Sequence, residues 1–160
     1  MSDQISADAV RSAVLGGLEE AFESVHGYFL DKGTSLFETL SQVTAGEASQ
    51  ASASSVGTLA AQVDHATFYL TEAIRFAQEG PGGAHADWAG SWSRTTVTDA
   101  EWDDLRANLR SEYSRMQDLV RSNPVWNEMT IGGCIATIAH SAYHLGEIRQ
   151  ALAVIRARQS

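Results

Sequence analysis

Apolar residues recur at the 3.6-residue spacing of an amphipathic helix along most of this 160-residue chain. No segment alternates polar and apolar residues with period two over a useful length, so strands are not expected. The two prolines, Pro81 and Pro124, fall in segments that also carry Gly, Ser or Asn, so they mark loops. The sequence therefore predicts an all-α protein, and its length fits a single domain over residues 1–160.

Four segments carry the helical pattern, and a four-helix bundle is the predicted architecture. They span residues 7–30, from about 54 to 77, from 98 to 123 and from about 130 to 158. Thr98 and Glu101 form a capping-box motif at the start of the third segment. The apolar stripes are Val10, Val14, Leu18, Phe22, Val25 and Phe29; Val56, Leu59, Val63, Leu70 and Ile74; Trp102, Leu105, Leu109, Tyr113, Met116 and Val120; and Ile131, Ile135, Ile138, Ala142, Leu145 and Leu152.

The connections between these segments differ in character. A short apolar group at residues 36–40 continues the first helix after a kink near Gly33. Residues 41–55 are mostly small or polar, which predicts an exposed connection. The run EGPGGAHADWAGSWSRT is longer than about 15 residues, and loops of that length are often functional. Trp88 and Trp92 in this loop either cover the mouth of a cleft or attach the loop to the helices.

Charge and cysteine content exclude several classes of protein. The formal net charge of −9 and the lack of a basic cluster, apart from the short Arg156 and Arg158 end, disfavour binding to nucleic acid. Cys134 is the only cysteine, which rules out an internal disulfide and a thiolate metal cluster. The N-terminal MSDQISADAV has no signal-peptide pattern, and no stretch approaches about 20 apolar residues. We therefore expect a cytoplasmic protein without a membrane span.

Three histidines are the candidate metal ligands. His140 and His144 lie four residues apart on a helical segment, so their side chains share a face. An HxxxH pair alone is weak evidence, and two hydrogen-bonded surface histidines are the simpler alternative. His65 lies opposite the apolar stripe of its own helix, where it either joins this pair or is an exposed histidine paired with an acid. Its face also carries three aromatic residues, which predicts that a cleft or a subunit contact covers it; the neighbours are Phe68, Tyr69, Glu72 and Phe76.

Three imidazoles and no thiolate indicate an open, catalytic type of metal site, since a structural zinc site is usually closed by a fourth ligand. Zn²⁺ or Ni²⁺ is the expected ion, with Fe²⁺ or Mn²⁺ as alternatives, and neutral imidazole also suits Cu²⁺. Glu147 shares the histidine face of its helix. It is a fourth ligand, a general base or an acceptor that orients an imidazole, and we favour the last two roles. Tyr69 and Tyr143 either donate to a substrate or pack between helices.

The histidine of the second helix and the run HSAYHLGEIRQAL on the fourth resemble the DinB/YfiT-like superfamily of metal-dependent four-helix proteins. The resemblance extends over the whole chain in helix order and loop placement, but only the three histidines and the HxxxHxGxIRxxL run are specific. It implies that His65, His140 and His144 hold a divalent metal. It also implies a homodimer and, in characterised branches, transfer or isomerisation chemistry with low-molecular-weight thiols. The family often has Gln where Glu147 stands.

These observations predict a metal-dependent thiol S-transferase or hydrolase that acts on a small molecule. The ion would lower the pKa of a thiol or a water and so make it a nucleophile. Two alternatives from other classes remain open. One is a non-catalytic bundle that senses or stores a metal or small ligand, and the other is a dimerising bundle whose histidines are incidental.

Overall fold

The computed structural model describes residues 5–52, 56–80 and 86–159. Within these ranges the chain is helical apart from its loops and one isolated antiparallel bridge between Ala51 and Thr58, which confirms the predicted all-α class. None of the helices in this described part is long and apolar enough to cross a membrane. The long helices are α1 (Ala7–Phe22), α4 (Leu59–Glu79), α5 (Asp99–Ser122) and α6 (Glu128–Ala157); the short ones are α2 (Leu36–Leu40), α3 (Ala45–Ala48) and the 3₁₀ turn η1 (Gly90–Trp92).

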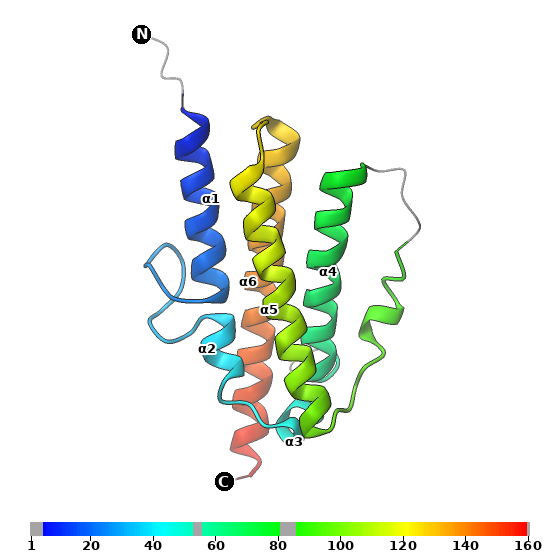
Figure 1. Cartoon of the computed structure of the whole chain (residues 1–160). Coiled ribbons are helices and arrows are strands. Elements are labelled where there is room, and N and C mark those ends of the chain that lie inside the picture. Colours follow the sequence, from blue (N-terminus) through cyan, green and yellow to red (C-terminus); the bar gives the residue numbers. More distant parts are fainter. Residues whose placement is uncertain (1–4, 53–55, 81–85, 160) are drawn as a thin grey trace.

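The four long helices lie side by side, with α4 and α5 running in one direction and α1 and α6 in the other (Figure 1). α4 packs against α5 and α6, and α1 packs against the same two helices. Because the neighbours α4 and α5 are parallel, the connection from the end of α4 to the start of α5 must run back along the length of the helices. Residues 86–98 of that return connection, which include η1, lie along α4 (Figure 1).

Helix α5 forms as its sequence predicts. Thr98 and Glu101 make a reciprocal capping box, and the helix ends before Asn123 and Pro124. All six residues of its predicted stripe are buried in the core between the long helices. Trp102 also donates a hydrogen bond from Nε1 to the Val43 carbonyl oxygen at 2.8 Å, which satisfies its buried polar atom.

The predicted extension of the first helix to residue 30 is wrong, because α1 ends at Phe22. The buried Glu20 carboxylate accepts hydrogen bonds from four backbone N–H groups of the next segment, at 2.6–3.1 Å. Gly27 has a φ of +88°, a left-handed conformation that a helix excludes. The segment therefore folds around a carboxylate, and α2 is a separate helix; the four donors are His26, Tyr28, Phe29 and Leu30.

The segment at 41–55 is less exposed than predicted. It contains α3, which begins with a capping box between Thr44 and Glu47. Two apolar side chains of α3 are buried, and so is the one that precedes it, so this connection contributes to the core; they are Val43, Ala45 and Ala48. Ser55 and the other two residues of 53–55 lie outside the described residues.

Two predicted stripes also need correction. α4 begins at Leu59, after the N-cap Thr58, and not near Ser54, which lies outside the described residues. Val56 therefore precedes the helix and is 63% exposed, while the other four stripe residues of α4 are buried. On α6, Ile135 is 59% exposed although it was assigned to the buried stripe. This helix has apolar residues on more than one side, so spacing alone did not identify its core-facing side.

Candidate metal centre

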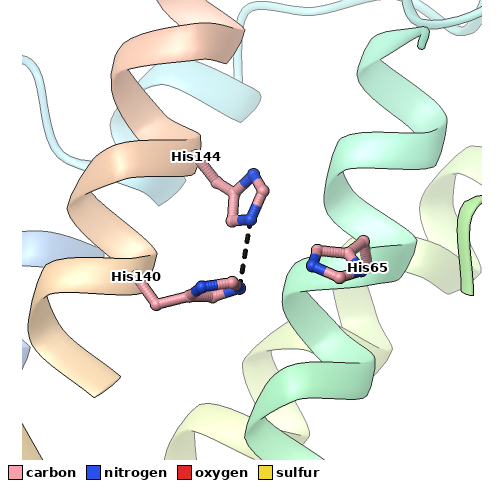
Figure 2. A group of neighbouring side chains, drawn as sticks. All are labelled: His65, His140 and His144. Carbon is pink, nitrogen blue, oxygen red and sulfur yellow. Dashed lines mark hydrogen bonds between the residues drawn. The ribbon is translucent and has the colours of Figure 1, made fainter. Parts of the chain in front are cut away.

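Two neighbouring long helices bring the three predicted histidines together (Figure 2). His65 comes from the middle of α4, and His140 and His144 come from one face of α6. One ring nitrogen from each histidine lies within 4.8 Å of the other two. His65 and His144 are buried and His140 is half-buried, so the cluster is not a group of surface histidines.

Gln62 determines which nitrogen of His144 faces the cluster. Its amide nitrogen donates to the Val56 carbonyl oxygen at 2.8 Å and to Glu147 Oε2 at 2.7 Å. These two bonds identify which end of the Gln62 amide is the nitrogen, so the other end is the oxygen Oε1. Oε1 lies 2.5 Å from His144 Nδ1 and must accept a hydrogen bond from it. His144 therefore carries its proton on Nδ1, and the lone pair of Nε2 points toward the other histidines.

Ser91 of η1 likewise determines which nitrogen of His65 faces the cluster. The Ser91 hydroxyl donates its single proton to the Trp88 carbonyl oxygen at 2.8 Å. Its oxygen lies 2.8 Å from His65 Nδ1 and therefore accepts from that nitrogen. The Nε2 lone pair of His65 is left for the cluster. The Gly90 N–H donates to Asp87 Oδ1 at 2.8 Å, a local bond that shapes the turn carrying Ser91.

Aromatic rings stack on the faces of two of the imidazoles. Tyr69 stacks on His140 with ring centroids 3.7 Å apart and an interplanar angle of 16°. Trp92 stacks on His65 at 4.1 Å and 22°. Trp92 thus packs directly on a candidate ligand, and Trp88 contacts the same ring at a centroid distance of 6.2 Å. The long connection therefore both attaches to α4 and forms part of the wall around the histidines.

The surroundings keep the imidazoles neutral at pH 7. Burial, with smaller contributions from the nearby His140 and His65, lowers the pKa of His144 to about 3. Burial also lowers the pKa of His140 to about 4, with an added contribution from His65, and burial lowers the pKa of His65. A neutral imidazole has the lone pair that a metal requires, so the three side chains are in the ligating protonation state.

Glu147 makes no hydrogen bond or ion pair to any histidine that the structure describes. One of its carboxylate oxygens accepts from Gln62, and the other accepts from the Tyr143 hydroxyl at 2.9 Å. Its contact with the cluster thus runs through Gln62 to His144. Tyr143 is exposed at 58%, and its hydroxyl hydrogen-bonds within α6 and does not bridge two helices.

Asp64 and Glu72, the two acids near enough in sequence to pair with His65, form ion pairs with arginines. Asp64 lies 3.5 Å from Arg94 in the return connection, and Glu72 pairs with Arg75 at 2.7 Å. His26 lies apart from the cluster, is exposed and sits 3.3 Å from Glu19. His85 lies outside the described residues.

The donor set fits a divalent ion. Nε2 of His140 and Nε2 of His144 lie 3.0 Å apart, and the second of these is the unprotonated nitrogen (Figure 2). Without an ion, a proton on His140 Nε2 must bridge this pair. A single cation would instead accept both lone pairs together with that of His65, and first-row divalent metals prefer such nitrogen ligands.

Sequence reasoning missed Gln62 and Ser91. Gln62 had a visible signal, because it lies three residues before His65 as a polar residue within the apolar run LAAQV. The sequence carries no such signal for Ser91, because only the path of the return connection brings this residue to α4.

The protein's function must be inferred from these side chains. Comparisons with protein-family models, with curated proteins and with solved structures found no match for this chain. The strongest functional feature is the buried cluster of His65, His140 and His144 together with the two hydrogen bonds that orient its rings.

Proposed function

We propose that this protein is a metal-dependent enzyme of the DinB-like type, a thiol S-transferase or a hydrolase, with His65, His140 and His144 as its metal ligands. One observation carries the proposal: three neutral imidazoles converge, and two of them donate Nδ1–H to fixed acceptors, which leaves Nε2 unprotonated. Such outer hydrogen bonds orient ligands in metal sites. The four long helices, and the histidine positions on α4 and α6, support the DinB-like bundle assignment.

A divalent ion with three histidine ligands and open positions supplies Lewis acidity that lowers the pKa of a coordinated thiol or water. The side chains around the cluster prepare that environment. Trp92 and Tyr69 cover the faces of two rings and reduce the access of bulk water, which strengthens electrostatic effects there. Imidazole ligands favour Zn²⁺ or Ni²⁺ as the ion, with Fe²⁺ or Mn²⁺ as alternatives.

Metal content tests the ligand assignment. Elemental analysis of the purified native protein should give close to one equivalent of metal per chain, and the His144→Ala variant should lose it. The exposed His26 offers a matched control, and His26→Ala should retain the native metal content. If the native protein carries no metal and binds neither Zn²⁺ nor Ni²⁺ at micromolar concentration, the proposal is wrong.

Turnover separates the transferase from the hydrolase. The metal-loaded protein is assayed with a low-molecular-weight thiol and an organic electrophile, and in parallel with activated esters and no thiol. Thiol-dependent product formation that disappears in His144→Ala supports the transferase, and thiol-independent hydrolysis supports the hydrolase. Stoichiometric metal without turnover in either assay would instead identify the non-catalytic binding function.

A further inference from the structure

A cleft of about 610 Å³ opens beside the metal centre, where α4 and α5 end and α6 begins. This volume lies within the range of pockets that bind small organic molecules, about 300–1,000 Å³. Its wall is mostly apolar, and no metal-site histidine forms part of it. The main apolar lining residues are Phe76, Trp88, Met116, Leu119, Val120 and Cys134.

Two aromatic residues belong both to the cleft and to the surroundings of the histidines. Tyr69 lines the cleft while its ring stacks on His140 at 3.7 Å. Trp88 lines the cleft and lies 6.2 Å from both His65 and Tyr69, measured between ring centroids. The cleft and the metal centre therefore adjoin each other at Tyr69 and Trp88.

Among the described residues that line the cleft, the one cation is Arg75, and acidic groups balance its charge. Arg75 makes a 2.7 Å ion pair with Glu72 and lies 3.7 Å from Glu79. By contrast, Phe76 and Trp88 leave 45% and 47% of their surface exposed while lining the cleft, although apolar surface is stabilised by burial. The lining therefore fits an uncharged, apolar group.

We propose that this cleft binds the uncharged apolar arm of the substrate whose reacting group lies at the three histidines. The proposal rests on the proposed function, and it specifies the substrate class as molecules that join a polar, metal-directed group to an apolar body. Tyr69 and Trp88 lie where the two parts of such a molecule would meet.

The first test measures ligand binding to the cleft in the absence of metal. N-Phenyl-1-naphthylamine, a neutral fluorescent probe, is titrated into chelator-treated protein. We expect saturable binding, and Ala136→Trp, which adds a large side chain at an exposed position of the lining, should weaken it at least tenfold. Ala153→Trp is the matched control, because Ala153 is exposed on the same helix outside the cleft lining and should leave probe binding unchanged.

The second test connects the cleft to the metal centre. Straight-chain alkyl hydroxamic acids, which bind zinc through their polar end, are titrated into the zinc-loaded protein. Each added methylene that enters the cleft should tighten binding about fourfold. In Ala136→Trp this dependence on chain length should disappear, while the affinity for acetohydroxamic acid and for zinc stays at the native value.

The outcomes distinguish the two proposals. Probe binding that is insensitive to Ala136→Trp, or hydroxamate affinity that is independent of chain length on zinc-loaded protein, overturns the assignment of the cleft and leaves the metal centre intact. Absence of zinc binding, with the neutral probe still bound and still displaced by Ala136→Trp, overturns the proposed function and shows that the cleft takes an apolar ligand unconnected with a metal.

Discussion

Two of the three imidazoles are oriented by uncharged side chains. A carboxylate bonded directly to an imidazole would raise its basicity strongly, whereas the Gln62 carbonyl and the Ser91 hydroxyl orient the rings without adding charge. The carboxylate of Glu147 lies one hydrogen bond further out and polarises the amide of Gln62. Glu147 can therefore affect the metal centre only through the position and polarity of Gln62.

This arrangement predicts the effect of removing the Gln62 amide. Gln62→Leu keeps most of the side-chain volume but removes the acceptor for His144 Nδ1–H, so the ring loses its orientation. We expect the Kd for zinc to rise about 10- to 100-fold. Competition with a chromophoric chelator measures this constant.

Gln78→Leu is the control for Gln62→Leu, since Gln78 is exposed near the end of the same helix. It should leave the zinc Kd within a factor of two of the native value. An equally small change in Gln62→Leu would show that the amide does not position His144.

At the scale of single elements, local signals decided which helices could be predicted. α5 combined a capping box, a regular stripe and an Asn-Pro end, and all of these agree with the structure. α1 was predicted too long, because Val25 and Phe29 continue its apolar spacing. In the structure the buried Glu20 carboxylate accepts from the backbone N–H of Phe29 and of three neighbouring residues instead. Apolar periodicity does not show such a network of hydrogen bonds from a side chain to the backbone.

In the metal centre, too, some residues could be predicted from local spacing and others could not. The histidines were predictable, because their positions on α4 and α6 follow from helical spacing and those positions face each other once the helices pack. The two acceptors were not, since Ser91 depends on how the return connection runs, and the role of Gln62 depends on Glu147 from another helix. The sequence thus indicates the ligands more readily than the groups that orient them.

The turn after α1 should depend on Glu20. Glu20→Gln replaces one acceptor oxygen by an amide NH₂, which cannot accept the backbone N–H groups that converge there. Burial by itself raises the pKa of Glu20, but the backbone hydrogen bonds outweigh it and lower the pKa to about 2, so the native group is charged at neutral pH. Losing charged hydrogen bonds in a buried position should reduce the free energy of unfolding by about 2–3 kcal/mol.

Urea unfolding followed by circular dichroism measures this change, with Glu19→Gln as the control. Glu19 is adjacent in sequence, but its side chain is 47% exposed and pairs with the exposed His26, so its loss should cost less than about 0.5 kcal/mol. Equal effects of the two substitutions would disprove the special role of Glu20. Both variants should still bind zinc, because neither residue contacts the metal centre.

For the whole molecule, the homodimer stays a prediction, and α6 supplies a surface on which to test it. Ile135, Ala139 and Tyr143 recur every four residues on one exposed side of this helix, with Ile135 and Tyr143 more than half exposed. A second copy of the chain packed there would bury them. Ile135→Lys should then convert a dimer to a monomer in sedimentation velocity without lowering the thermal midpoint of the monomer. A native protein that sediments as a monomer at 100 µM contradicts the prediction.

The stability of the metal-free protein should depend on pH through the buried histidines. Folding lowers the pKa of His140 to about 4 and of His144 to about 3, from the usual value of 6.5. Between pH 6.5 and these values the unfolded chain binds more protons than the folded one, so the free energy of unfolding falls as the solution is acidified. The stabilisation is complete above pH 6.5 and declines progressively below it.

The window from pH 6.5 to 5.0 isolates this effect, because carboxylates with lowered pKa values, such as Glu20, Glu38 and Glu47, lose stability only as the pH falls through about 4.5. Urea midpoints of chelator-treated protein should therefore decrease across that window. His140→Gln combined with His144→Gln should flatten the dependence, while His26→Gln should retain it. A native midpoint that stays constant from pH 6.5 to 5.0 would mean that the cluster takes up protons without unfolding, which conflicts with the burial of His144.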